Sequence, residues 1–403
     1  MSVTEHFQRL RGALEQKGVD VDAVIERLTA QRVETPSWGY ANSGTRFRVF
    51  PQPGVPRTVF EKFEDAAEVH RHTGVSPGLA IHIPWDRVDD YQELTTFADS
   101  LGLHVGAINP NLFQDEEYKF GSVCHPSADV RRHAVEHLKE CIDIAGKTRS
   151  SVISVWLADG TNYAGQDSIR GRRARMVEAL HEAYAAMPAD MSMLLEYKPF
   201  EPAFYETDLA DWGAALVLCQ RLGERAKVLM DLGHHLPGTN IEQIVALLLD
   251  EGRLGGFHFN NRKYGDDDLV VGSINPMELF LIYFELAEVD SPTSRDVAYM
   301  IDQSHNVEPK IEAMILSVMN LQEAYAKALI VDRDALATAQ GDQDVLRAHG
   351  VLRDAFDTDV RPLCAHVRER LGASTDPISA FRSSGYMEKI AAAREGGDQA
   401  GWT

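Results

Sequence analysis

Four short apolar runs of the sequence each lead to a residue that could bind a metal ion. Glu196 ends MLLE, Asp231 ends VLMD, His258 lies within GFHF, and Asp302 ends YMID. A carboxylate that is buried without a partner costs several kcal/mol, and four such groups side by side would repel one another. A divalent cation held by three carboxylates and one imidazole would satisfy all four. The oxygen-rich set suits Mn²⁺, Mg²⁺ or Co²⁺ better than a structural zinc ion.

A second set of candidate ligands follows the second and third of these runs. His234 stands beyond a glycine after VLMD, and Asp266 and Asp268 are separated by one residue. Residues two apart in an extended loop point to the same side, so Asp267 would point away. Together with a shared carboxylate such as Glu196, this set could hold a second cation roughly 4 Å from the first.

Each of these residues also has an ordinary structural explanation. A lone His258 on an apolar strand is more often a satisfied core histidine, and an acidic run after Tyr-Gly is more often a solvated turn. Asp231 could be a helix cap, and Glu196 could pair with Lys198. The occurrence of four candidates at the ends of successive runs favours the metal site, because separate explanations would otherwise have to hold for each.

Other apolar runs end on residues that could bind a neutral polyol. Trp85 in IHIPWD and Trp156 in SVWLADG offer flat apolar faces for a sugar, while His82, Lys198 and Asn109 offer hydrogen bonds. Tryptophan is more often a core residue, but two at run ends beside polar groups favour carbohydrate. The sequence has no arginine cluster for a phosphate group.

Runs of strand length alternate with segments of helical period from residue 36 to about residue 330. We expect strands at 37–42, 78–86, 104–111, 151–160, 191–200, 226–235, 255–263 and 297–306. We expect helices at 61–72, 91–102, 128–147, 169–187, 211–223, 241–252, 276–288 and 310–330. This alternation predicts a closed (β/α)₈ TIM barrel, whose functional groups project from the C-terminal ends of the strands. An open doubly wound sheet is the alternative, but no Gly-x-Gly-x-x-Gly follows the first strand.

The ends of the chain have a different pattern. Residues 1–35 are predicted to form an N-terminal helical segment before a catalytic barrel domain at 36–330, and residues 331–403 a C-terminal helical extension. Within the extension we expect helices at 333–349 and 351–371, followed from Ser383 by a tail rich in Gly, Ser and charge, whose last fifteen residues are loosely attached and solvated. The extension would pack on the barrel exterior or on a neighbouring subunit.

Composition excludes several classes of partner. The 61 Asp and Glu of the 403-residue chain outnumber the 40 Lys and Arg, giving a formal charge of -21 that would repel nucleic acids and anionic membranes. The 4 cysteines form no Cys-x-x-Cys pair, and neither a signal peptide nor a membrane span is recognisable. We therefore expect a cytoplasmic protein that acts on a small molecule.

A family resemblance that covers residues from about 35 to 330 is carried by the motifs LLEYKPFEP, MDLGHH, FHFNNRKYGDDDL, MIDQSHN, PSWGYANSGTRF and AIHIPWD. They resemble the bacterial L-rhamnose isomerases of broad sugar specificity, within the xylose-isomerase-like barrels. The resemblance implies a Mn²⁺-dependent homotetramer with two divalent ions per subunit, although Co²⁺ and Mg²⁺ stay open. It implies a structural ion held by Glu196, Asp231, His258 and Asp302, and a catalytic ion held by Glu196, His234, Asp266 and Asp268. It also implies that Lys198 lies beside O1 of the sugar, with His82, Trp85, Trp156 and Phe113 in contact with it.

The chemistry implied is interconversion of an aldose and its ketose by moving hydrogen between C1 and C2. A base-mediated cis-enediol and a metal-promoted hydride shift both fit, and Asp302 and His82 are candidates for proton transfer in ring opening. L-Rhamnose is the expected substrate, with L-mannose, L-lyxose and D-allose as further candidates. The alternative is a ketose 3-epimerase, which also uses a Glu, Asp, His and acid set, but commonly with a second glutamate where this chain has Asp302.

Overall fold

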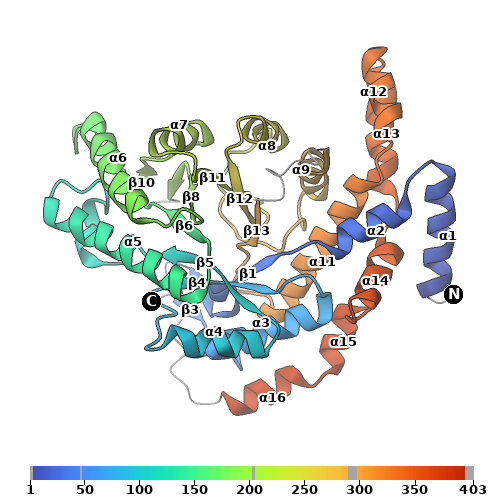
Figure 1. Ribbon diagram of the computed structural model, residues 1–403, viewed down its shortest axis with the longest axis horizontal. Helices are drawn as coiled ribbons and strands as arrows, with labels where there is room; N and C mark the ends of the chain where they lie inside the picture. The colour runs from blue at the N-terminus through green and yellow to red at the C-terminus, as the bar shows by residue number, and fades with distance from the viewer. Residues whose placement is uncertain (1–2, 46–47, 202–204, 289–296, 395–403) are drawn as a thin grey trace.

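The chain folds into a closed barrel of parallel strands surrounded by helices (Figure 1). The computed structural model describes residues 3–45, 48–201, 205–288 and 297–394. The order of the strands around the barrel is β1-β13-β12-β11-β8-β6-β5-β4. Their bounds are β1 Glu34–Pro36, β4 Gly78–Ile83, β5 His104–Pro110, β6 Val152–Trp156, β8 Ser192–Glu196, β11 Ala226–Asp231, β12 Leu254–Phe259 and β13 Ala298–Ile301. The predicted (β/α)₈ TIM barrel is confirmed.

A helix follows each barrel strand, close to the bounds expected from the sequence. These helices are α3 Val59–Thr73, α4 Tyr91–Ser100, α5 Ala128–Thr148, α6 Ile169–Ala186, α7 Trp212–Leu222, α8 Ile241–Asp250, α9 Pro276–Glu288 and α11 Lys310–Leu329. Six of them begin after a residue whose side chain accepts a hydrogen bond from a backbone N–H of the first turn, which satisfies a donor that the helix itself leaves free. The capping residues are Thr58, Asp90, Ser127, Ser168, Asp211 and Asn240.

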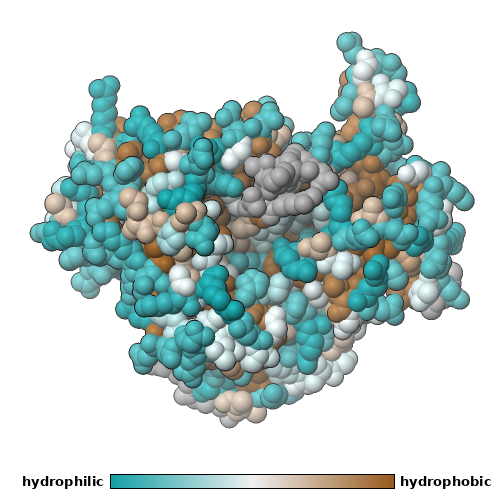
Figure 2. Space-filling model, in the orientation of Figure 1, coloured by the Kyte–Doolittle hydropathy of each residue, from teal (hydrophilic) through white to brown (hydrophobic). Residues whose placement is uncertain are grey.

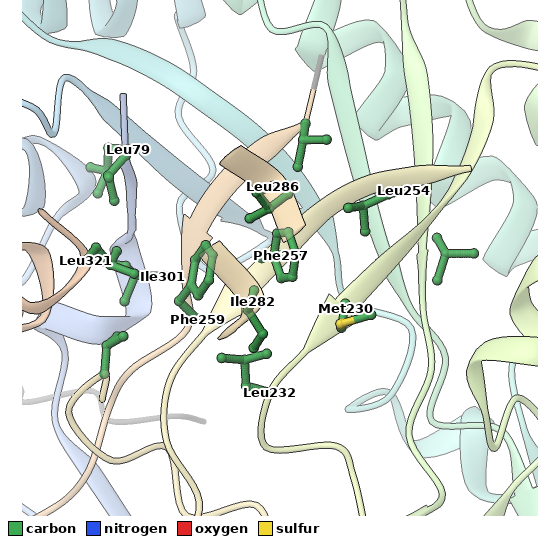
Figure 3. Close-up of a cluster of buried hydrophobic side chains, with 14 of the residues drawn as sticks. Leu79, Met230, Leu232, Leu254, Phe257, Phe259, Ile282, Leu286, Ile301 and Leu321 are labelled. Carbon is green, nitrogen blue, oxygen red and sulfur yellow. The ribbon is translucent and has the colours of Figure 1, made fainter. Parts of the chain in front are cut away.

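Strand β12 shows how the barrel separates its core from its interior. Phe257 and Phe259 are fully buried in the layer between strands and helices, together with Ile282 and Leu286 of α9 (Figure 3). Because side chains alternate along a strand, His258 between them faces the inside of the barrel. The two phenylalanines thus anchor the strand in the core, and the side chain of His258 is available to bind a group inside the barrel.

The expectation of a first strand at 37–42 is wrong. Residues Ser37–Tyr40 form a short 3₁₀ helix, η1, and the barrel strand is β1, which pairs Glu34 with Gly78 and Pro36 with Ala80. The apolar character of this run comes from burial of the Trp38 side chain, not from a strand.

Glu34 turns into the barrel near Gly106 of β5. Its carboxylate accepts a hydrogen bond from Ala107 N at 2.8 Å. A Cβ at position 106 would lie 2.1 Å from the Glu34 carboxyl carbon, so glycine there leaves room for this carboxylate inside the barrel.

Small elements that were not expected from the sequence lie in the loops after four barrel strands. The loop after β1 contains a hairpin, the loop after β5 a 3₁₀ helix, and the loops after β6 and β8 share a three-stranded sheet of order β7-β10-β9. Their bounds are β2 Ser43–Thr45, β3 Arg48–Phe50, η2 Glu116–Phe120, β7 Gly160–Thr161, β9 Phe200–Glu201 and β10 Tyr205–Thr207. These strands are too short for their periodicity to be recognised in the sequence.

The terminal segments pack beside one another on one side of the barrel (Figure 1). The N-terminal segment forms two helices, and the C-terminal extension forms five, of which the first two project from the body as a hairpin. Their bounds are α1 Val3–Gln16, α2 Val21–Thr29, α12 Arg333–Gly341, α13 Val345–Asp357, α14 Arg361–Arg370, α15 Pro377–Ser383 and α16 Tyr386–Ala393. Side chains of both terminal segments belong to the same buried hydrophobic cluster as the barrel helices. We therefore propose that the boundaries at residues 35 and 330 separate segments of one folded unit.

The expected irregular tail from Ser383 is wrong for α16. Ile390 is buried, and the guanidinium of Arg394 lies 2.9 Å from the Asp65 carboxylate of α3, so tertiary contacts hold this segment in a helix. Residues 395–403, the rest of the expected tail, lie outside the described residues.

Hydrophilic residues predominate on the face shown in Figure 2. In the described part of the chain, none of the helices has the length and apolar character needed to cross a membrane.

Candidate metal and sugar site

The four candidate ligands of the inner metal come together inside one end of the barrel. Glu196 and Asp231 end strands β8 and β11, His258 lies in β12, and Asp302 follows β13; these strands are neighbours in the barrel. One ligand atom from each residue lies within 4.8 Å of the others. His258 Nδ1 is 3.3 Å from Glu196 Oε2 and 3.5 Å from Asp302 Oδ2. Ligand atoms around one divalent cation are about 3 Å apart at metal–oxygen distances near 2.2 Å, so this cluster could close around one ion.

Two atoms in this cluster are buried without a hydrogen-bond partner, and they face each other. Asp231 Oδ1 accepts hydrogen bonds from Gly233 N at 2.6 Å and Asn260 Nδ2 at 2.9 Å. Asp231 Oδ2 and His258 Nδ1 have no such partner and lie 3.8 Å apart. A buried polar atom without a partner costs about 1–3 kcal/mol, and coordination of a cation would remove that cost for both atoms. The residues therefore fit a divalent metal ion.

The electrostatics of the cluster also favour a positive charge. Burial raises the pKa of Asp231 to about 7, and the carboxylates of Glu196 and Asp302 act in the same direction against the opposing effect of His234. Burial would lower the pKa of His258, but the carboxylates of Glu196, Asp302 and Asp231 outweigh it and raise the pKa to about 10. The cluster thus attracts either a proton or a cation.

The second candidate set lies directly beside the first. Ligand atoms of His234 and Asp266 lie within 4.8 Å of each other and of Asp231, a member of the first set, whereas Asp268 is not part of this group. Glu196 has one oxygen toward each histidine: Oε1 is 3.2 Å from His234 Nδ1, while Oε2 faces His258. His234 Nε2 is 3.2 Å from Asp266 Oδ1. Glu196 therefore stands where a carboxylate bridging two cations would have to stand.

The three consecutive aspartates divide as expected from their alternation. Asp266 and Asp268 both line the cavity at the barrel mouth, and Asp268 adopts a left-handed backbone conformation with φ 47°. The carboxylate of Asp267 accepts hydrogen bonds from the backbone N–H groups of Lys263 and Tyr264, each at 2.7 Å. The expectation that Asp267 faces away from the metal ligands is confirmed. It closes the turn that presents its two neighbours.

Lys198 forms ion pairs at the edge of the second set. Its Nζ donates hydrogen bonds to Asp266 Oδ2 at 2.6 Å and Glu201 Oε2 at 2.7 Å, and lies 5.0 Å from the centre of the Trp156 ring. Burial would lower its pKa, but Asp266 and Glu201 outweigh this and raise the pKa well above the usual value. The buried ammonium group therefore stays charged. The ion pair between Lys198 and Glu196 that was considered from the sequence is not formed, because Lys198 pairs with Asp266 and Glu201 instead.

Another part of the cavity lining is an aromatic wall made of His82, Trp85, Phe113 and Trp156. The rings of His82 and Trp85 stack with centroids 3.9 Å apart, and the centroids of Phe113 and Trp156 are 4.8 Å apart. Burial, with a smaller effect of Lys62, lowers the pKa of His82 to about 3, so its imidazole is neutral. The wall and all the candidate metal ligands except the fully buried Asp231 line one cavity of 600 Å³. The sequence-predicted site residues are therefore all brought together.

Several residues that line the cavity were missed by the sequence reasoning, Trp38, Glu201 and Tyr205 among them. Trp38 donates a hydrogen bond from Nε1 to Asp302 Oδ1 at 2.6 Å, and Glu201 and Tyr205 line the cavity from the small sheet after β8. The sequence signal for Trp38 was an aromatic residue in the motif PSWGY. The direction of its side chain could not be predicted, because it depends on the 3₁₀ helix η1. Nothing local in the sequence distinguishes Glu201 from a surface glutamate.

A third acidic cluster resembles a metal site, but its carboxylates are already paired with donors of the protein. Cys124, Asp159 and Asp208 offer ligand atoms within 4.8 Å of one another. The Asp159 carboxylate accepts hydrogen bonds from Ser122 N, Ser122 Oγ and Cys124 N, and Asp208 pairs with the fully buried Arg172 at 2.7 Å. The guanidinium supplies the positive charge here, so this cluster is structural.

Fold and site together define a TIM barrel whose strand ends form an acidic, histidine-containing centre beside an aromatic wall. The chain belongs to the xylose isomerase-like TIM barrel family, whose model matches residues 63–281. It is 44% identical over 400 residues, 98% of this chain and 93% of the relative, to a probable sugar isomerase of Rhizobium meliloti (strain 1021). It is 26% identical over 211 residues, 49% of this chain and 54% of the relative, to a xylose isomerase of Thermus thermophilus.

Solved structures of the same architecture include sugar epimerases. An L-ribulose 3-epimerase matches 75% of this chain and 98% of its own with a TM-score of 0.55 at 16% identity. A D-allulose 3-epimerase from Methylomonas sp. matches 72% of this chain and 95% of its own with a TM-score of 0.54 at 14% identity. At these identities the likeness concerns the fold alone.

Proposed function

We propose that the protein is a divalent-metal-dependent sugar isomerase that interconverts an aldose and its ketose. The observation that carries the proposal is the pair of adjoining ligand sets around Glu196, which share one cavity with Lys198 and the aromatic wall. The 44% identity to a probable sugar isomerase, over nearly the whole of both chains, supports the same class of reaction.

The proposed ligands of the inner ion are Glu196, Asp231, His258 and Asp302, and those of the outer ion are Glu196, His234, Asp266 and Asp268. We propose Mn²⁺ as the ion at both positions, with Co²⁺ or Mg²⁺ as substitutes. When bound, such ions polarise a carbonyl group and lower the pKa of hydroxyl groups attached to them. Metal binding by these residues is supported by Asp231 Oδ2 and His258 Nδ1, which are buried without a hydrogen-bond partner.

The remaining residues have roles that follow from their charge and position. The Lys198 ammonium, held by Asp266 and Glu201, would stabilise negative charge developing at O1 of the sugar. Neutral His82 could accept or donate a proton at the sugar ring during opening, and Asp302, oriented by Trp38, could do the same from the other side. Trp85, Phe113 and Trp156 would pack on the apolar face of the sugar and exclude water.

We propose L-rhamnose and L-rhamnulose as the substrate pair, with L-mannose, L-lyxose and D-allose as slower substrates. The motif resemblance supports this choice, and the rings of Trp85 and Phe113, with centroids 6.1 Å apart, offer apolar surface in the cavity for the methyl group of a 6-deoxy sugar. We also propose a homotetramer in the cytoplasm. The projecting helix α13 exposes Val345 to 75% and Leu346 to 82%, which suits burial against another subunit.

The test is a ketose-formation assay with protein that has been stripped by EDTA and restored with Mn²⁺. Conversion of L-rhamnose, absent in the stripped protein and recovered with the metal, is expected. A parallel incubation with ketoses identifies products by NMR. Epimerisation at C3 without aldose conversion would replace the proposal by the 3-epimerase alternative, and no reaction with any of these sugars would refute both. Light scattering should give four times the chain mass of 44.8 kDa.

A further inference from the structure

The carboxylate of Asp86 lies behind the aromatic wall and joins two parts of it. Its Oδ2 accepts hydrogen bonds from the backbone N–H of His82 at 2.8 Å and from the hydroxyl of Ser37. Its Oδ1 accepts from Lys62 Nζ at 2.6 Å. Asp86 is buried and does not line the cavity. Both oxygens of this carboxylate are thus used to hold other groups, through three hydrogen bonds.

The groups that Asp86 holds are adjacent to residues of the site. Ser37 directly precedes Trp38, whose indole N–H donates to Asp302 at 2.6 Å and whose ring meets His82 edge-on at 5.6 Å. On the other side, Asp86 N donates to His82 O at 2.8 Å, which closes the turn that stacks Trp85 on His82. One carboxylate therefore links η1 to the end of β4.

Lys62 makes this arrangement stable. The side chains of Lys62 and Asp86 are 10% and 0% exposed. An unpaired carboxylate at this depth would be strongly unfavourable, and the ammonium group from α3 compensates it. The pair also anchors α3 to the back of the wall.

We propose that Asp86, with Lys62, is a positioning residue that sets the distance between Trp38 and His82 and thereby the shape of the cavity beside Asp302. Its kinetic consequence rests on the proposed function. A displacement of about 1 Å in such a wall can reduce turnover by 10–100-fold, so the effect is measurable without contact between Asp86 and the sugar.

The test compares Asp86→Asn with Asp65→Asn. Asp65 is also buried and paired with a basic residue, Arg394, at 2.9 Å, and it lies on the same helix as Lys62, away from the cavity. Both variants lose a buried ionic contact and are expected to be less stable than the wild type. At a temperature where all three are folded by circular dichroism, Asp86→Asn should lower kcat/KM by about tenfold or more. Asp65→Asn should keep the wild-type value.

A second measurement does not depend on turnover. Three of the 5 tryptophans line the cavity, so acrylamide quenching of tryptophan fluorescence reports on the wall. Quenching should increase in Asp86→Asn and stay unchanged in Asp65→Asn. Equal kinetics and equal quenching in the two variants would make Asp86 merely structural and overturn the proposal. If the wild type converts no aldose, the proposed function fails, and quenching alone then decides the role of Asp86.

Should Asp86→Asn fail to fold, Ser37→Ala provides the same test with the ion pair intact. It removes one hydrogen bond to Asp86 and frees η1 next to Trp38. Increased quenching with a reduced kcat/KM supports the proposal. Wild-type values of both in a folded Ser37→Ala protein overturn it.

Discussion

Replacing Asp231 by asparagine is expected to stabilise the metal-free protein and at the same time to weaken its binding of divalent cations. Asp231 is 0% exposed, and its Oδ2 has no hydrogen-bond donor. Asparagine keeps the shape and keeps an oxygen that accepts from Gly233 and Asn260. It replaces the unpartnered oxygen by a neutral NH₂ group and removes a charge from among other carboxylates.

The size of the effect follows from the pKa. Burial raises the pKa of Asp231 from 3.8 to about 7, so the folded protein holds the proton more tightly than the unfolded chain does. Stability therefore falls as pH rises between these two values, and the full cost is present above pH 7. A difference of about 3 units at about 1.4 kcal/mol each gives about 4 kcal/mol. Asp231→Asn should recover up to this amount at pH 8 and much less at pH 5.

The measurement is urea unfolding followed by tryptophan fluorescence in EDTA at both pH values, together with Mn²⁺ titration by calorimetry. Asp159→Asn is a matched control, because Asp159 is equally buried but its oxygens accept three hydrogen bonds. That variant should lose stability. A metal-free Asp231→Asn protein that is less stable than the wild type at pH 8 would refute the electrostatic reasoning, and unchanged Mn²⁺ affinity would refute the ligand role.

Three further changes test other parts of the structure. Glu196→Gln should lose both ions, because its two oxygens face different ligand sets; elemental analysis that finds both ions retained would exclude its bridging role. Burial raises the pKa of Glu34 to about 7, so ionisation of this partly exposed group lowers the stability of the folded protein increasingly from pH 4.5 to pH 7. The Glu34→Gln variant should therefore have a higher free energy of unfolding in urea than the wild type at pH 8, by less than about 3 kcal/mol, and the same free energy of unfolding at pH 4.5. Arg394→Met leaves Asp65 buried without its guanidinium and should cost about 3–5 kcal/mol, seen as a lower Tm, and an unchanged Tm would show that the Arg394–Asp65 ion pair does not stabilise the fold.

Much of the fold could be predicted because it depends on local patterns. The helices after the barrel strands have the period and the polar caps of amphipathic helices, and seven of the eight barrel strands are apolar runs long enough to be recognised. The exception is β1, with three residues, where the neighbouring Trp38 and Tyr40 supplied the apolar signal instead. The C-terminal helix α16 was missed because its stability comes from Ile390 and Arg394, whose partners are far away in the chain.

The sequence by itself determined the identity of the candidate ligands. A carboxylate or histidine at the end of an apolar strand is chemically conspicuous, because burial requires a compensating charge, and strand order in a barrel follows chain order. The alternation of side chains also separated Asp267 from its neighbours. These inferences needed only local geometry.

Only the tertiary structure decided how the cavity wall is built. Trp38 reaches Asp302 because η1 turns it inward, Lys198 pairs with Asp266 from the loop after β12, and Asp86 links η1 to β4 with Lys62 behind it. Each of these links joins segments that lie far apart in the chain, and its direction is set by packing instead of by periodicity. A sequence lists such residues as ordinary polar or aromatic positions until the fold brings them together.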